Sequence, residues 1–211
     1  MTVARVTIWV GLLAALALPL PAWADPVPTG RQSDRASPYM RVFGVSQPPY
    51  GFVKFCDREP DECRQGPQEE QRFSAKPDRL SELDAVNRAV NREIEAATDL
   101  EIYGQTEYWT IPTARGDCED YALLKRHMLM QAGWPREALL ITVVRDKNDE
   151  GHAVLTVKTN LGEFILDNQE PQVLAWNKTG YKFIKRQSQV DQNTWVALGE
   201  PRGAPAYVSA R

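Results

Sequence analysis

Three residues have the types and the spacing that covalent catalysis on a carbonyl group requires: Cys118, His152 and Asp167. A cysteine becomes a strong nucleophile when a histidine can take its proton, and an acid that orients the histidine completes the arrangement. The chain contains two histidines. His127 follows Cys118 on the same expected helix, at a spacing that places it on the opposite side. His152 is therefore the histidine that can serve Cys118.

The expected pairing of two strands brings Asp167 close to His152. The segments "HAVLTVKT" and "GEFILDN" form favourable cross-strand pairs when Leu155 faces Leu166. In this register His152 and Asp167 are diagonal neighbours on one face, roughly 7–8 Å apart along the backbone. A shift of one residue would place them on opposite faces. The register therefore predicts a Cys–His–Asp group.

Each of the three residues also has a simpler explanation. A histidine in a strand is often structural, and an aspartate before an asparagine is often a turn former. Cys118 could be a buried, unreactive cysteine, a partner in an intermolecular disulfide, or a free reactive thiol. A helix start favours the thiolate, which supports the catalytic interpretation.

Cys118 lies in the first turn of a predicted helix. Asp117 is the expected N-cap, Asp120 follows three residues later, and Gly133 is suited to the C-terminal end. The backbone N–H of Cys118 could supply one donor to an oxyanion, with Trp109 or a neighbouring linker group as the second donor.

Three carboxylates surround the cysteine: Asp117, Glu119 and Asp120. In one interpretation Asp117 and Asp120 cap the helix and Glu119 complements its dipole. In the other they form a cation site, because carboxylate oxygens are the ligands that Ca²⁺ prefers. A bound cation would also offset the repulsion that these charges exert on a thiolate.

Helical and strand-like segments flank this motif. Between Leu80 and Ala97, apolar residues recur in steps of three and four, which predicts a helix that packs on the core. Helices followed by strands favour an α+β fold. We place the domain at residues 78–200 and a C-terminal tail at residues 201–211. The alternating segments that predict an antiparallel sheet are "ALLITVVRD", "HAVLTVKT", "EFILDN" and "YKFIKRQ".

Residues 25–77 precede this domain and are rich in Pro, Gly, Arg and Gln, which predicts an irregular N-terminal extension. Cys56 and Cys63 lie within it, close together in the stretch "FCDREPDEC". A local disulfide between them is expected in an oxidising compartment.

Residues 1–24 have the features of a secretory signal peptide. Arg5 precedes an apolar run, and Ala22 and Ala24 form a small-residue cleavage site. The alternative is an uncleaved N-terminal anchor, although the run is short for a membrane span. The formal net charge of −3, without a basic stripe, argues against a nucleic-acid partner. We expect an exported, periplasmic protein.

Five blocks of the sequence carry a resemblance to a known family: "VNRAVN", "EYWTIP", "GDCEDYALLKRHMLMQAGWP", "GHAVLTVKT" and "FILDN". They resemble the bacterial transglutaminase-like cysteine proteinases. The resemblance implies a papain- and transglutaminase-like fold, with the nucleophile at a helix start packed on an antiparallel sheet. It implies that Cys118 is the nucleophile, that His152 is the general base and acid, and that Asp167 orients His152.

The LapG-type branch of this family consists of periplasmic proteases that cleave a large surface adhesin. Resemblance to it implies that Asp117, Glu119 and Asp120 bind Ca²⁺. It also implies an adhesin as the protein substrate and an inner-membrane receptor as a regulatory partner. Two other functions are compatible with the same residues: acyl transfer of the transglutaminase or amidase type, and a non-catalytic periplasmic binding protein.

Overall fold

The computed structural model describes residues 37–63 and 73–199. The predicted signal peptide at residues 1–24 and the predicted tail at residues 201–211 lie outside these ranges. Within the described ranges, no helix has the length and apolar character needed to cross a membrane.

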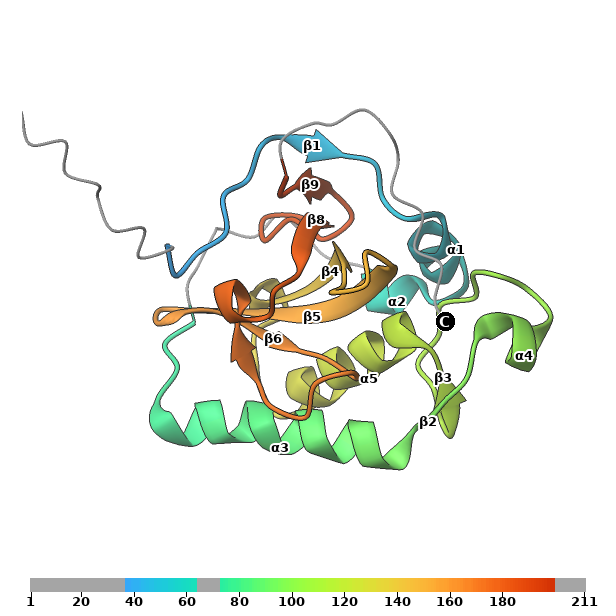
Figure 1. Ribbon diagram of the computed structural model, residues 1–211, viewed down its shortest axis with the longest axis horizontal. Helices are drawn as coiled ribbons and strands as arrows, with labels where there is room; N and C mark the ends of the chain where they lie inside the picture. Colours follow the sequence, from blue (N-terminus) through green and yellow to red (C-terminus); the bar gives the residue numbers. More distant parts are fainter. Residues whose placement is uncertain (1–36, 64–72, 200–211) are drawn as a thin grey trace, which may run out of the picture. The chain divides into compact units, whose positions relative to one another are not determined.

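An antiparallel sheet of seven strands forms the centre of the described part (Figure 1). Its strand order is β1-β9-β8-β4-β5-β6-β7. The four predicted segments are confirmed as β4 (Leu139–Arg145), β5 (Gly151–Thr159), β6 (Gly162–Leu166) and β8 (Lys182–Gln187). Three strands too short to show alternation complete it: β1 (Val45–Ser46), β7 (Leu174–Ala175) and β9 (Trp195–Ala197).

Both faces of the central strands are buried, because alternate side chains enter two different clusters. On one face, Ile141 and Leu155 join the main core. On the other face, Val144, Val154 and Ile165 pack in a smaller cluster. This explains why β4 is apolar at nearly every position.

Two helices cover the face that carries the main core. Helix α5 (Cys118–Gln131) packs on β5, and α3 (Pro77–Glu93) packs on α5 and β6 (Figure 1). The predicted C-terminal stop of α5 is confirmed, since Gly133 has a left-handed φ of 81°. The α+β prediction is therefore confirmed, with helices on an antiparallel sheet.

The prediction of an irregular N-terminal extension is wrong for residues 50–63. This stretch forms α1 (Tyr50–Arg58) and α2 (Pro60–Cys63). Phe52 and Phe55 of α1 are buried in the main core, so the segment belongs to the domain. Composition misled here, because the prolines next to these helices lie at their starts, where proline is tolerated, and the apolar residues of α1 recur at helical spacing. The expected Cys56–Cys63 disulfide is confirmed.

The linker between α3 and α5 is closed by a short parallel pair of strands. Strand β2 (Glu95–Ala96) pairs with β3 (Arg115–Gly116) directly before α5, and α4 (Asp99–Tyr103) lies between them in sequence. Gly116 is required at this junction, because a Cβ atom there would stand 2.7 Å from Oδ2 of Asp120. Two short 3₁₀ helices, η1 (Arg136–Ala138) and η2 (Trp176–Lys178), complete the described elements.

Candidate active site

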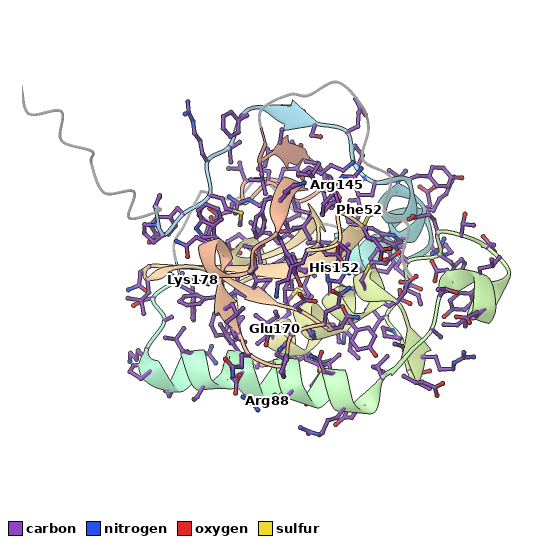
Figure 2. The ribbon with its side chains drawn as sticks, in the orientation of Figure 1. Phe52, Arg88, Arg145, His152, Glu170 and Lys178 are labelled. Carbon is purple, nitrogen blue, oxygen red and sulfur yellow. A yellow bond between two sulfur atoms is a disulfide. The ribbon has the colours of Figure 1, made fainter. Side chains whose placement is uncertain are left out.

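The predicted register of β5 and β6 is confirmed, and it brings His152 and Asp167 together. Leu155 pairs with Leu166. Nε2 of His152 lies 2.8 Å from Oδ1 of Asp167, and both residues are buried. Figure 2 labels His152 within the interior, near the start of α5. Because Nε2 is used for Asp167, Nδ1 is the ring nitrogen left for a reacting group.

The carboxylate of Asp167 is held from several directions. Besides His152, the backbone N–H of Gln169 donates to Oδ1 at 2.9 Å, and the hydroxyl of Tyr181 donates to Oδ2 at 2.5 Å. Burial alone would raise the pKa of Asp167, but the bonds from His152 and Tyr181 lower it below its usual value. The pKa of the Tyr181 hydroxyl is raised, mainly by burial and then by its hydrogen bond to Asp167. Asp167 therefore stays ionised, as an acid that orients a histidine must.

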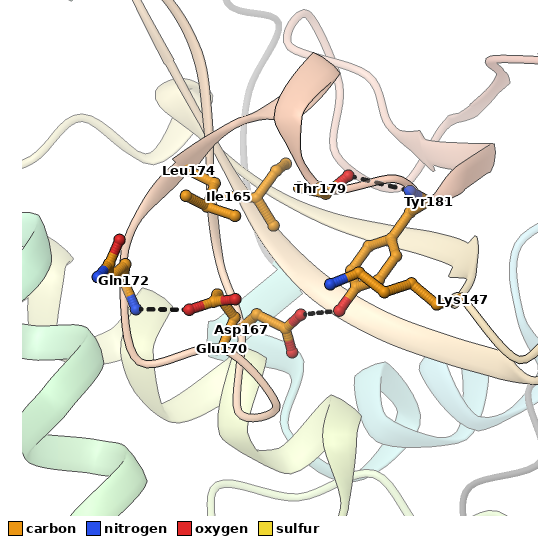
Figure 3. Close-up of a pocket in the computed structure, with 8 residues that line it drawn as sticks. All are labelled: Lys147, Ile165, Asp167, Glu170, Gln172, Leu174, Thr179 and Tyr181. Carbon is orange, nitrogen blue, oxygen red and sulfur yellow. Dashed lines mark hydrogen bonds between the residues drawn. The ribbon is translucent and has the colours of Figure 1, made fainter.

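A pocket lies beside this carboxylate, and Figure 3 shows the hydrogen bond between Asp167 and Tyr181 at its wall. The ring of Tyr181 also meets the imidazole of His152 edge-on, with centroids 5.9 Å apart. Tyr181 thus contacts both members of the pair. The residues that line the pocket are Lys147, Ile165, Asp167, Glu170, Gln172, Leu174, Thr179 and Tyr181.

Helix α3 fixes the backbone of Asp167. Oδ1 of Asn87 accepts from the N–H of Asp167 at 3.0 Å, and Nδ2 of Asn91 donates to its carbonyl at 2.8 Å. Nδ2 of Asn87 also donates to the carbonyls of Glu170 and Pro171. This helix therefore does more than pack on the core, since two of its side chains position the acid.

Cys118 begins α5 and lies against the strand that carries His152. Its Sγ accepts from the backbone N–H of Ala153 at 3.3 Å, one residue after His152. The single hydrogen of its thiol is directed at Oε2 of Glu119, 3.0 Å away. The structure therefore places the sulfur of Cys118 against β5, at the residue that follows His152.

The electrostatic surroundings of Cys118 oppose the expected effect of the helix dipole. Burial, followed by the charges of Glu119 and Asp117, raises the pKa of the Cys118 thiol well above its usual value. A helix start by itself would lower that pKa. Here burial and the neighbouring carboxyl groups outweigh the dipole, so the proton stays on sulfur until that negative charge is offset.

The other predicted placements can now be compared with the structure. His127 is turned away from the cysteine, since its Nδ1 lies 3.2 Å from Oε1 of Glu62. Trp109 is fully buried and its indole N–H donates to Glu107, so it is not aimed at the position of an oxyanion. Asp117 is the N-cap residue of α5, but its side chain does not cap the helix.

The carboxylates near Cys118 form a group that differs in one member from the predicted set. Asp99, Asp117 and Glu119 each offer an oxygen within 4.8 Å of the others, and all three residues are buried. Asp120 is outside this group. Its Oδ1 accepts from the backbone N–H of Thr110 at 2.8 Å, and its Oδ2 is buried without a hydrogen-bond partner among the described residues. We call Asp99, Asp117 and Glu119 the acidic cluster.

The acidic cluster has more negative charge than the protein can pair. Oδ1 of Asp99 and Oδ1 of Asp117 are buried without a hydrogen-bond partner in residues 37–63 and 73–199. Burial, with the charge of Asp99, raises the pKa of Asp117 to about 6. Burial, with the charge of Asp117, raises the pKa of Glu119 well above its usual value. Buried carboxylate oxygens without internal donors fit a hard divalent cation.

Asp99, Tyr181, Asn87 and Asn91 were not among the predicted site residues. Asn87 and Asn91 carry a usable signal, because two amides four residues apart lie on one helix face beside the apolar stripe. Asp99 and Tyr181 have no such signal in the sequence, since tertiary contacts bring each of them to the site. Asp99 is brought to Asp117 by the β2–β3 pair, with its N–H 3.4 Å from Oδ2 of Asp117.

Comparisons with known proteins identify a family and several similar solved structures. Residues 42–203 match the family described as bacterial transglutaminase-like cysteine proteinase, and this range includes α1 and α2. A comparison with curated proteins finds no match. The chain is also similar to solved structures of LapG from Legionella pneumophila. The calcium-bound structure shares 26% identity at a TM-score of 0.49, over 64% of this chain and 76% of that one.

The structure of EGTA-treated LapG shares 29% identity at a TM-score of 0.45, over 54% of this chain and 64% of that one. The family match covers most of the chain, from ahead of α1 to beyond β9. The chain belongs to the bacterial transglutaminase-like cysteine proteinase family.

Proposed function

We propose that the protein is an exported peptidase that cleaves a peptide bond with Cys118, His152 and Asp167. The observation that carries the proposal is the His152–Asp167 bond of 2.8 Å on the strand whose Ala153 N–H contacts the sulfur of Cys118. Membership of a cysteine proteinase family supports it. The alternative of a buried structural cysteine does not account for the bonded pair of His152 and Asp167 on the strand that contacts the sulfur.

The proposed reaction passes through a thioester. His152 takes the proton of the Cys118 thiol, and the thiolate attacks the carbonyl carbon and forms the C–S bond. The C–N bond breaks as His152 gives that proton to the leaving amine. His152 then takes a proton from water, whose oxygen attacks the thioester, and the C–S bond breaks to release the acid and the thiolate. Asp167 holds the ring of His152 in position through both steps. The backbone N–H of Cys118, at the start of α5, is one proposed donor to the oxyanion.

We propose that Asp99, Asp117 and Glu119 hold Ca²⁺, with Asp120 as a neighbouring charge and not a ligand. The support is the unpartnered oxygens of the acidic cluster and their hard-donor chemistry. A bound Ca²⁺ supplies positive charge that offsets the carboxyl groups that keep the proton on Cys118. Asp117 and Glu119 are therefore proposed to bind the ion and, through it, to favour the thiolate.

The proposed substrate is a protein, and the resemblance to the LapG-type branch favours a cell-surface adhesin. The same resemblance underlies the proposals of a periplasmic location, a cleaved signal peptide at residues 1–24, and an inner-membrane receptor as regulator.

The test uses the purified protein in Ca²⁺ with a peptide library made from a tryptic digest of a bacterial proteome. We expect mass spectrometry to find cleaved peptides with the unmutated protein and none with Cys118→Ala. Circular dichroism should show the same fold for both. Cleavage that survives in Cys118→Ala would refute the proposal. Incorporation of an added amine at the new acyl end, instead of water, would favour the transglutaminase alternative.

A further inference from the structure

Consecutive residues of the linker before α5 make backbone contacts that hold two of the acidic side chains. The N–H of Tyr108 donates to Oδ2 of Asp99. The N–H of Thr110 donates to Oδ1 of Asp120 at 2.8 Å. Because Oδ2 of Asp99 is engaged in this way, its other oxygen, Oδ1, is left for a cation, and Oδ1 has no hydrogen-bond partner among the described residues. The backbone at Tyr108 therefore sets the direction of a proposed ligand atom.

An arginine of α1 holds this stretch of backbone, which passes beside α1 (Figure 1). Nη2 of Arg58 donates at 2.7 Å to the carbonyl of Trp109, the residue between the two that bond the acids. The guanidinium of Arg58 also lies over the ring of Tyr108, with its central carbon 4.0 Å from the ring centroid. A planar guanidinium can stack on a ring and donate a hydrogen bond at the same time. Arg58 therefore contacts the linker at two adjacent residues.

The helix that carries Arg58 is itself fixed against the linker. A Cβ atom on Gly51 would stand 2.3 Å from Cδ1 of the Trp109 indole, so only glycine allows this close approach. The ring of Phe52 meets the indole of Trp109 edge-on, with centroids 6.0 Å apart, and Trp109 is fully buried. Arg58 lies within the short loop that the Cys56–Cys63 disulfide closes. Both ends of α1 are thus held, and Arg58 extends from a fixed backbone.

The simplest explanation for Arg58 is a surface charge at the end of a helix. Arg58 is exposed and lies in the last turn of α1, where a positive charge complements the helix dipole. The dipole requires only a positive charge at this place. It requires neither the hydrogen bond to the Trp109 carbonyl nor the stacking on Tyr108. These two contacts indicate a role that depends on the shape of the side chain.

We infer that Arg58 is a positioning residue for the proposed Ca²⁺ site, which fixes the backbone of Tyr108 and Trp109 so that Asp99 presents its free oxygen to the ion. The inference rests on the proposed binding of Ca²⁺ by the acidic cluster. The positive charge of Arg58, taken alone, repels a cation. A positioning effect and a charge effect on Ca²⁺ affinity therefore have opposite signs.

The test compares Arg58→Met, which removes the charge and the donors, with Arg58→Lys, which keeps the charge and one donor but loses the planar group. Arg41→Met is the matched control, because Arg41 is also exposed and lies over an aromatic ring, that of Phe43, at 5.0 Å. Isothermal titration calorimetry measures the Ca²⁺ affinity of each purified protein. Thermal unfolding in EGTA shows whether each variant is folded without the ion.

For Arg58→Met we expect Ca²⁺ to bind roughly tenfold more weakly, at the lower end of the range for groups that support metal ligands. Arg58→Lys should have an intermediate affinity, because its ammonium can donate to the Trp109 carbonyl but cannot stack as a guanidinium does. Arg41→Met should bind Ca²⁺ within about twofold of the unmutated protein, since exposed charges are screened by salt.

Unchanged or tighter Ca²⁺ binding by Arg58→Met would overturn the inference, because a residue that acts only through its charge gives that result. An equal loss of affinity in Arg41→Met would also overturn it. Should Arg58→Met fail to fold in EGTA, Arg58→Gln provides the same comparison with a neutral polar side chain. If Asp99→Asn weakens Ca²⁺ binding and the Arg58 variants do not, only the inference fails. If the unmutated protein binds no Ca²⁺, the proposed ion site fails and the inference fails with it.

Discussion

The buried carboxyl group of Asp167 and the buried carboxyl groups of the acidic cluster have opposite hydrogen-bonding environments. Asp167 accepts hydrogen bonds from His152, Gln169 and Tyr181, and its pKa is lowered. In the acidic cluster, Asp99 and Asp117 have oxygens without partners among the described residues, and burial raises the pKa of both. Both oxygens of Asp167 are therefore satisfied by donors of the protein. The acidic cluster has more carboxylate oxygens than the protein has donors for them.

The difference shows which part of the site depends on the fold and which depends on a ligand. Hydrogen bonds fix Asp167 in one orientation and stabilise its charge. The acidic cluster has the charge but not the donors, so its stable states are partial protonation or a bound cation. The oriented acid and the proposed ion site are therefore expected to respond differently to substitution, chelation and pH.

The largest effect on activity is expected from a substitution of Asp167. Asp167→Asn keeps the size of the side chain but removes the charge that holds His152 in the required tautomer. We expect kcat to fall by about 10³- to 10⁴-fold, as for other buried acids that orient a catalytic histidine. Initial rates with the cleaved peptide measure this, and calorimetry should show unchanged Ca²⁺ binding. An Asp167→Asn protein that keeps a tenth of its activity would contradict the proposed role.

The membership of the acidic cluster can be tested by a pair of matched substitutions. Asp99→Asn removes a proposed ligand, whereas Asp120→Asn removes an equally buried charge that is bonded to Thr110. We expect about 10- to 100-fold weaker Ca²⁺ binding for Asp99→Asn, a range comparable to the loss of a group that supports a metal site. Asp120→Asn should bind Ca²⁺ within a few-fold of the unmutated protein in isothermal titration calorimetry. The reverse order would restore Asp120 as a ligand.

A smaller effect on activity is expected from removing one of the hydrogen-bond donors to Asp167. Tyr181→Phe deletes the hydroxyl bonded to Oδ2 of Asp167 and keeps the ring that packs on His152. A hydrogen bond to a charged group contributes about 1.5–3 kcal/mol, so we expect kcat to fall by roughly tenfold or somewhat more. Steady-state kinetics measure the change. A Tyr181→Phe enzyme with normal kcat would mean that His152 and Gln169 hold Asp167 without it.

The smallest expected effect is on stability as a function of pH in the presence of a chelator. The pKa of Asp117 rises from 3.8 to about 6 and that of Asp120 from 3.8 to about 8 on folding. The folded state therefore binds more protons than the unfolded state between about pH 4 and pH 8. The free energy of unfolding should fall as the pH rises through this window.

Thermal unfolding in EGTA should show this as a melting temperature that is lower at pH 8 than at pH 5. About 1 kcal/mol corresponds to roughly 2–4 °C for a domain of this size. Saturating Ca²⁺ should reduce the fall, because the ion stabilises the charged carboxylates. A melting temperature that rises toward pH 8 in EGTA would contradict the raised pKa values of Asp117 and Asp120.

The sequence predicted those parts of the site that depend on local periodicity. The register of β5 and β6 follows from alternation, and it correctly places His152 beside Asp167. The start of α5 follows from Gly116 and the N-cap residue Asp117, and it places Cys118 in the first turn. The disulfide follows from two nearby cysteines in a chain expected to be exported.

The parts that could not be predicted depend on tertiary contacts. Asp99 reaches Asp117 only because β2 and β3 pair in parallel, and two-residue strands leave no periodic signal. The direction of the pKa shift of Cys118 depends on burial, which the first turn of a helix does not reveal. Helix α1 was missed because the prolines that precede it and the many glycines of the segment dominate its composition.

The β2–β3 pair has a consequence for how this family can vary. It joins the two ends of the linker from residue 97 to residue 114, immediately before the nucleophile. A change in the length of a closed loop costs little free energy, since the closure term grows only slowly with length. Insertions or deletions in this linker should therefore reshape the rim around Cys118 without displacing α5. The β2–β3 pair would thus allow the linker, and with it the substrate preference, to diverge while α5 stays in place.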